Sequence, residues 1–310
     1  MSDLFTGYGL LCALALMMTL CVAGLWYRRQ HIAYGVWVRL CVLAIPLAWL
    51  CARVAFCLTN LLYYVDMVEN PGLMLRFRDG GYSLFGAMGG LILAACLTAR
   101  WQRVSAAVLL DGLGLAAPLG IAIERLAQTG TGIGWGRDIK SEWLQPIGVT
   151  DNLWHPVYLY QAVVTLLLLL VLLAWLKTRR GALIDGDLAL VFATLYGCVE
   201  VVMASLCKDG HMMVHDNLVH VNQIIAIVLP VAALVIWSIR LAKKGEQKSQ
   251  RVTGWLVVAW LILIACIGIG INQEFAVDRK NNLYLEYGIM IAAMAVAAAT
   301  TLITRRKANQ

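Results

Sequence analysis

The chain has 310 residues, of which 61% are hydrophobic and 14% are charged, and its mean hydropathy is +0.75. Soluble domains average roughly 45 to 50% apolar and about 25% charged residues, so this composition excludes an ordinary soluble domain and predicts a polytopic membrane protein. The net charge of +7 comes without a basic patch interleaved with aromatic residues. We therefore expect contact with anionic headgroups and no nucleic-acid partner.

Nine apolar stretches are long enough to cross the hydrocarbon, which takes roughly 20 apolar residues per helix. They cover about residues 6–27, 35–58, 82–99, 104–123, 155–176, 187–207, 217–239, 253–271 and 284–303. We expect the first to remain a span, because its basic residues follow the apolar run. The predicted fold is all-α, with a seven-helix core over residues 1–242 and an appended two-helix hairpin over residues 252–310, separated by the polar linker KKGEQKSQR.

Five basic clusters predict the orientation, because Lys and Arg are retained on the cytoplasmic side. They follow the first, third, fifth, seventh and ninth spans, and consist of Arg28 and Arg29; Arg100 and Arg103; Lys177, Arg179 and Arg180; Arg240, Lys243, Lys244, Lys248 and Arg251; and Arg305, Arg306 and Lys307. We therefore expect the N-terminus outside and the C-terminus inside. The expected location is a cytoplasmic membrane, which the family resemblance described below identifies as the inner membrane of a bacterium.

The first three spans carry features with two interpretations each. Tyr8 is either an interfacial anchor or a hydroxyl pointing into a cavity. Arg53 stands among apolar residues, where a cation needs an internal acid or a ligand. Spaced glycines open the third span and fit either close helix packing or the wall of a ligand cavity; they are Gly80, Gly81, Gly86, Gly89 and Gly90.

The stretch from Asp111 to Arg137 is the strongest candidate site. It carries a buried-looking acid, then Arg125 and Gln128, which share one face if the helix continues that far. Four glycines follow and offer backbone N–H groups to an anion; they are Gly130, Gly132, Gly134 and Gly136. The pattern lacks the G-K-[ST] of a nucleotide loop. The alternative is a flexible external loop.

Later spans add a histidine and a buried acid. His155 and Tyr158 are three residues apart and share a face of the fifth helix, where His155 either caps and packs or reacts. Glu200 lies well inside the sixth span, and a carboxylate there is paired, protonated or functional. Pairing of Glu200 with Arg125 or Arg53 is the structural alternative.

We expect neither a metal site nor disulfides. The nine cysteines form no C-x-x-C and lie mostly in apolar spans. His211, His215 and His220 are spaced by four and five residues without an adjoining acid motif, which makes a metal site the weaker interpretation.

The first seven spans resemble prolipoprotein diacylglyceryl transferase, from about residue 7 to residue 240. The resemblance rests on the order and spacing of short pieces that are individually unspecific. They are Y-G-L at Tyr8; G-G-x-S at Gly80; D-x6-P-x-G-x4-R from Asp111 to Arg125; W-G-R at Trp135; H-P-x-x-L-Y at His155; L-Y-G at Leu195; and Gln223 before an apolar run.

This resemblance implies a cavity open to the outer leaflet, and transfer of a diacylglyceryl group from phosphatidylglycerol to a lipobox cysteine of a lipoprotein precursor, without metal or organic cofactor. It implies that Arg125 holds the lipid phosphate. Tyr8, Gly136 and Arg137 would border the headgroup, and His155 would stand near the cavity mouth.

The chain also departs from the family pattern. Phe85 stands where the family carries a histidine before a glycine pair, and Ile133 stands where an acid is usual. In the sixth span, Y-G-x-x-R-x-x-x-E becomes Tyr196, Gly197, Glu200 and Ala204. An acid in place of an arginine moves the local charge by two units.

Three functions follow as hypotheses. The first is a transferase of altered chemistry, with catalytic Arg125, Glu200 and His155, and with Glu200 or His155 as base. Its substrate-binding residues are Tyr8, Arg53, Gln128, Gly136, Arg137, Tyr158 and Gln223. The second is a lipid- or peptide-binding protein without turnover. The third, a transporter, is weaker because internal repeats are absent.

Overall fold

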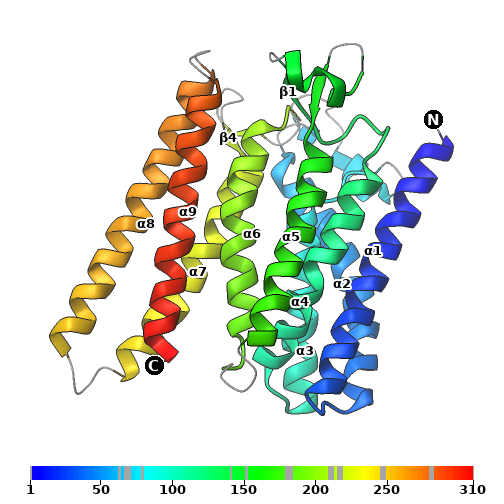
Figure 1. The fold of residues 1–310 in the computed structure, drawn as a ribbon. Helices are drawn as coiled ribbons and strands as arrows, with labels where there is room; N and C mark the ends of the chain where they lie inside the picture. The colour runs from blue at the N-terminus through cyan, green and yellow to red at the C-terminus, as the bar shows by residue number, and fades with distance from the viewer. Residues whose placement is uncertain are drawn as a thin grey trace. The chain divides into compact units, whose positions relative to one another are not determined.

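The structure is a computed structural model that describes residues 2–61, 64–65, 71–77, 80–139, 142–150, 153–178, 184–208, 213–214, 219–244, 249–278 and 283–309. Within these ranges, nine helices are long and apolar enough to cross a membrane (Figure 1). The predicted class, an all-α polytopic membrane protein, is confirmed. The orientation of the termini stays a prediction.

The helices are α1 (Ser2–Arg29), α2 (Tyr34–Thr59), α3 (Leu84–Gln102), α4 (Ala106–Ala127), α5 (Val157–Thr178), α6 (Asp187–Leu206), α7 (Val221–Lys244), α8 (Ser249–Asp278) and α9 (Leu283–Asn309). Two 3-10 helices, η2 (Pro71–Leu75) and η4 (Glu142–Ile147), lie in connections. Two short antiparallel ribbons, which the sequence does not predict, pair β1 (Trp135–Asp138) with β2 (Trp154–Pro156), and β3 (Met213–Val214) with β4 (Val219–His220).

The chain forms two compact units. Unit 1 comprises Met1–Ala127 and Asp185–Ala189, and unit 2 comprises Gln128–Ile184 and Leu190–Gln310. The predicted division into residues 1–242 and 252–310 falls inside unit 2 and stays a prediction.

Unit 1 is built from two pairs of helices, α1 with α4 and α2 with α3. Its core is made mostly of small and aliphatic residues from all four helices. Tyr27 lies in this core and donates a hydrogen bond of 2.6 Å from its hydroxyl to the Leu109 carbonyl of α4. Small residues let helices approach closely in lipid, where the hydrophobic effect does not drive association.

Close packing accounts for Gly86 and Gly90 of α3. A Cβ on Gly86 would lie 2.5 Å from the Cys51 carbonyl oxygen of α2, and one on Gly90 would lie 2.7 Å from the Ala48 Cα. Gly89 faces the other way, with no atom within 4 Å of a built Cβ. Of the two interpretations of this glycine stretch, helix packing is the one these contacts support.

These contacts predict that Gly90→Ala separates α2 from α3, while Gly89→Ala does not. Overpacking a tight interface costs typically 1 to 3 kcal/mol, so we expect Gly90→Ala to lower the unfolding midpoint in detergent by several degrees. Gly89→Ala is the matched control in the same helix. Equal midpoints for the two variants would contradict this packing.

Asp111 caps the start of α6. Its two carboxylate oxygens accept hydrogen bonds from the backbone N–H groups of Gly186, at 2.7 Å, and Ala189, at 2.9 Å. These are among the N–H groups that a helix start leaves without an internal partner. Gly114, three residues on, admits the Ala189 backbone, since a Cβ there would lie 2.7 Å from the Ala189 Cα. Asp111 therefore has a structural role within unit 1.

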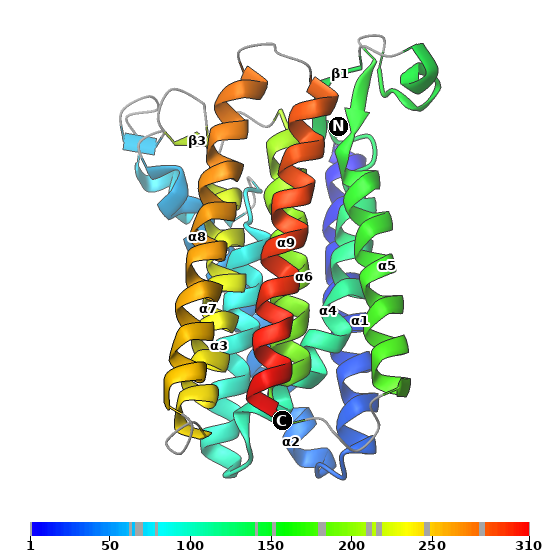
Figure 2. The ribbon, with the colours of Figure 1, turned by 60° about the vertical axis from the view of Figure 1, so that its left-hand side comes forward.

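In unit 2, α8 and α9 lie side by side and α7 packs against α9 (Figures 1 and 2). Both helices of the appended pair are longer than the apolar stretches that predict them. In α8 the helix continues past residue 271 to Asp278, and Gln273 and Glu274 on this extension are buried. The apolar pattern of the sequence stops at these polar residues, although the helix continues.

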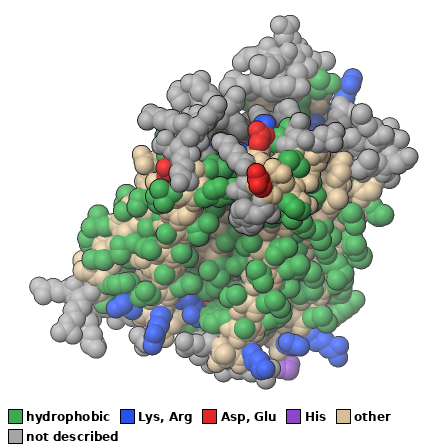
Figure 3. Space-filling view, turned by 45° about the horizontal axis from the view of Figure 1, so that its top comes forward, with side chains coloured by type: hydrophobic (Ala, Val, Ile, Leu, Met, Phe, Trp, Pro, Cys, Tyr) green, Lys and Arg blue, Asp and Glu red, His purple; other side chains and the backbone are tan. Residues whose placement is uncertain are grey.

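The molecular surface fits a bilayer environment. Figure 3 shows hydrophobic side chains over a broad area of the face that it draws. Exposed large apolar side chains occur on most of the described spans, including Leu10, Trp49, Leu170 and Leu261. An exposed apolar surface of this extent is expected where lipid is the solvent.

Candidate functional site

Arg125 lies in the last turn of α4, where a cation is favoured by the helix dipole. The residue is 9% exposed, and its Nε lies 3.6 Å from the Glu124 carboxylate. A guanidinium is a planar fork of N–H donors that matches the geometry of a phosphate. Arg125 is thus a desolvated cation suited to a phosphate.

Tyr8 belongs to the same polar group. Its hydroxyl donates a hydrogen bond of 3.3 Å to Glu124 from the facing helix α1. This places the hydroxyl beside the acid that contacts Arg125, while both interpretations of Tyr8, cavity hydroxyl and interfacial anchor, stay predictions. Glu124, which the sequence hypothesis leaves out of the site, links the two predicted residues.

Arg53 organises a loop. Its three guanidinium nitrogens donate to five backbone carbonyls around η2, those of Leu73, Met74, Arg76, Gly80 and Gly81. All five N–H donors of the side chain are thereby used. Arg53 thus holds together the described parts of the connection between α2 and α3, and these carbonyls compensate its buried charge.

In unit 2, Gln128 and Tyr158 meet at Gly134. A Cβ on Gly134 would clash with the Gln128 side chain and lie 2.9 Å from the Tyr158 Cβ, while the Tyr158 N–H donates to the Gly134 carbonyl at 3.1 Å. Gly134 has φ +72°, which favours glycine. The helix α4 ends at Ala127, so Gln128 lies in a turn and the condition for its sharing a helical face with Arg125 is not met.

Gly136 lets β1 approach the strand that carries His155. A Cβ at Gly136 would lie 2.6 Å from Val157 Cγ2 and 3.0 Å from His155 Cβ, and Gly136 also bridges to Cys207. Three predicted site residues, Gly136, Arg137 and His155, therefore lie on one two-stranded ribbon.

His155 lies in β2, and the prediction that it shares a helical face with Tyr158 is wrong, because α5 begins only at Val157. Its Nδ1 instead lies 3.1 Å from the Tyr160 hydroxyl. Burial lowers the pKa of the His155 imidazole below its ordinary value. Burial therefore favours the neutral form of the ring, which is the form that can accept a proton.

Glu200 is 1% exposed and held by Gln161 of α5, whose Nε2 donates to both carboxylate oxygens at 3.1 and 3.2 Å. This contact joins α5 to α6 inside unit 2. The sequence alone does not single out Gln161, although an amide inside an apolar span is a signal that could have found it.

Arg137 and Gln223 are both bound by Glu274 of α8. The Arg137 Nη2 lies 3.6 Å from one carboxylate oxygen, and the Gln223 Nε2 donates to the other at 3.0 Å. The backbone N–H of His220 donates to Gln223 Oε1 at 2.9 Å, which caps the start of α7. Burial, and then the Arg137 cation, lower the pKa of His220.

The described residues hold no group of three or more His, Cys, Asp or Glu arranged to bind a metal ion. His211 and His215 lie outside the described residues, so the spacing of the three histidines is not tested. The described cysteines are all unbridged.

Comparison with known sequences decides the family. The family model described as prolipoprotein diacylglyceryl transferase matches residues 5–239, which is most of the chain. The chain belongs to this family. The expected resemblance is thereby confirmed, and α8 and α9 lie beyond the matched residues.

Individual members of the family are distant in sequence. A phosphatidylglycerol--prolipoprotein diacylglyceryl transferase of Clostridioides difficile is 25% identical over 249 residues, covering 77% of this chain and 92% of the relative. One of Bacillus licheniformis is 26% identical over 254 residues, covering 78% of this chain and 90% of the relative. The matches span nearly the whole length of these relatives, and their names indicate a bacterial transferase.

Proposed function

We propose that the chain is a membrane transferase that moves a diacylglyceryl or related lipid group from a phosphatidylglycerol-type lipid to a nucleophile. The acceptor is the lipobox cysteine of a lipoprotein precursor, or a similar thiol, hydroxyl or amine. The single observation that carries the proposal is the buried Arg125 at the end of α4, within a chain whose family relatives are named for this transfer. The site would face the outer leaflet.

The reaction needs an anion site for the leaving group. The acceptor thiol sulfur forms a bond to the terminal glyceryl carbon, and the bond from that carbon to the phosphate oxygen breaks. The oxygen keeps the electron pair and leaves as glycerol phosphate, while the thiol proton passes to a base. Arg125 is assigned the phosphate, because a partly desolvated guanidinium stabilises the charge that grows on the leaving oxygens.

The base is assigned to His155. Burial favours the neutral form of its imidazole, and the residue lies on the ribbon that also carries Gly136 and Arg137. Glu200 is the second candidate, but its contact with Gln161 suits a role in holding α5 to α6. Tyr8, Gln128, Gly136, Arg137, Tyr158 and Gln223 are assigned to substrate binding, and Arg53 to the loop that it folds.

The alternative is a lipid- or peptide-binding protein that kept the fold without turnover. Phe85, Glu200 and Ala204 favour it, because they replace residues that the family resemblance implies at those positions.

Native mass spectrometry of the purified chain, before and after addition of a lipobox peptide, separates the two functions. The transferase retains phosphatidylglycerol, which is replaced by glycerol phosphate and a lipidated peptide. Retention of intact lipid with unmodified peptide would instead support the binding protein.

A further inference from the structure

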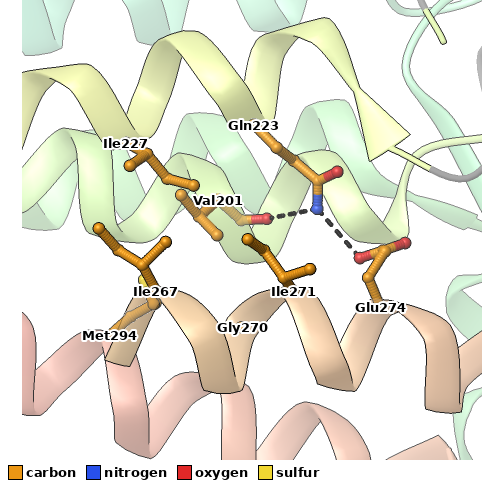
Figure 4. Close-up of a pocket in the computed structure, with 8 residues that line it drawn as sticks. All are labelled: Val201, Gln223, Ile227, Ile267, Gly270, Ile271, Glu274 and Met294. Carbon is orange, nitrogen blue, oxygen red and sulfur yellow. Dashed lines mark hydrogen bonds between the residues drawn. The ribbon is translucent and has the colours of Figure 1, made fainter. Parts of the chain in front are cut away.

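The appended helical pair contacts polar residues of unit 2, first through a buried carboxylate of α8. Glu274 of α8 is 3% exposed, and its two oxygens are divided between Arg137 and Gln223. Both partners belong to the part of the chain that the family model matches, whereas Glu274 lies outside it. Figure 4 shows Gln223 placed between the Val201 carbonyl of α6 and the Glu274 carboxylate of α8.

A second contact comes from α9. The Tyr287 hydroxyl donates to the Ser205 carbonyl at 3.1 Å, and the Arg137 Nε donates to the same oxygen at 3.4 Å. Arg137 is also among the charged neighbours of that hydroxyl. Thus α8 contacts Arg137 directly, and α9 contacts the Ser205 carbonyl that Arg137 also binds.

Arg137 keeps an open side. Its side chain is 31% exposed, while that of Glu274 is 3% exposed. The carboxylate thus fixes the inner side of the guanidinium and leaves part of the group accessible. A flexible arginine that is already held loses less side-chain entropy when it binds a ligand.

The cavity beside this group is too small for lipid. It has a volume of about 30 Å³ and lies between apolar side chains of α6, α7, α8 and α9, with Gln223 and Glu274 as its polar members. A space of this size suits a water molecule and excludes an acyl chain. This cavity therefore does not hold the lipid, and the exposed part of the Arg137 side chain is the group here that a headgroup can reach.

We propose that Glu274 is a positioning residue: it holds Arg137 and Gln223 in their binding orientation, so that α8 and α9 form part of the functional site. This inference rests on the proposed function for the role of Arg137 toward an anionic headgroup. It adds a residue that the family match does not contain, and gives the helical pair a function beyond anchoring.

The test is a double-mutant cycle on the full-length chain. Retention of lipid by each variant is measured in nanodiscs of phosphatidylglycerol or of phosphatidylcholine. We expect Glu274→Ala and Arg137→Ala each to weaken phosphatidylglycerol retention at least tenfold, and the double variant to be no weaker than Arg137→Ala. Glu274→Gln keeps an acceptor for Gln223 and loses the charge facing Arg137, so it should fall between Glu274→Ala and the wild type. Glu286→Ala, which removes a half-buried acid of α9, is the matched control and should bind as the wild type does.

The same variants are compared by thermal unfolding in detergent, which needs no lipid. Under the proposal the midpoint shifts of Arg137→Ala and Glu274→Ala are not additive. Additive shifts, or wild-type phosphatidylglycerol retention by Glu274→Ala while Arg137→Ala loses it, would overturn the positioning role. If the wild type retains no phosphatidylglycerol, the proposed function fails, and the unfolding cycle still decides whether Glu274 holds Arg137.

Discussion

Arg125→Ala is expected to abolish transfer from phosphatidylglycerol and to weaken retention of the lipid by roughly a hundredfold. Truncating one partner of a buried charged contact costs on the order of 2 to 5 kcal/mol, and each 1.4 kcal/mol is about tenfold in affinity. The loss should fall on anionic lipid, since the side chain is assigned to the phosphate. Native mass spectrometry of the retained lipid measures it.

Two further variants make this result specific to Arg125. Arg125→Lys keeps the charge without the planar fork of donors, so partial binding and slower transfer are expected. Arg39→Ala removes an exposed arginine of the same unit, which lies 6.0 Å from the Trp101 ring, and should leave binding unchanged. Normal lipid retention by Arg125→Ala would remove the phosphate site from the proposal.

His155→Ala is expected to lower the rate of transfer by roughly 10² to 10⁴, the usual contribution of a general base. Lipid retention should change little, because the imidazole is assigned to the acceptor proton. The exposed His31 serves as the control, since His31→Ala should transfer at the wild-type rate. If Glu200→Gln, rather than His155→Ala, stops transfer while lipid is retained, the base is Glu200.

The pH dependence follows from the lowered pKa of His155. The imidazole must be neutral to act as a base. The rate of transfer should therefore stay constant as the pH falls to about 6.5, the ordinary pKa of histidine, and decline only at lower pH. This acid limb should be missing from the residual rate of His155→Ala. In the same window the unfolded chain binds more protons than the folded one, so His155 makes folding less stable as pH drops below about 6.5.

The spans and the family could be predicted from sequence because both depend on local patterns. Apolar runs of sufficient length fix the helices of a membrane protein, and the ordered pieces around Arg125 and His155 identify the family. The resemblance also names Tyr8 and Arg137 residue by residue, and their roles in the site stay predictions. Their partners Glu124 and Glu274 were not named.

The missing parts depend on contacts between distant residues. In the sequence, Arg53 lies among apolar residues, as a ligand-binding cation would. Only the structure shows the five backbone carbonyls to which it donates. Hydropathy makes Glu274 look like the polar end of α8, although its buried carboxylate joins residues more than fifty positions away in sequence. His155 was placed in a helix because no local pattern reveals the pairing of β2 with β1.

The central claim is transfer of a lipid group, and one measurement tests it most directly. The purified chain in nanodiscs of phosphatidylglycerol labelled in its diacylglyceryl part is incubated with a lipobox peptide, and the peptide is analysed by mass spectrometry. The account predicts a labelled diacylglyceryl group on the cysteine of the peptide, released glycerol phosphate, and no product with Arg125→Ala. Lipid that stays intact on the wild-type chain, with no labelled thiol, hydroxyl or amine acceptor, would contradict it.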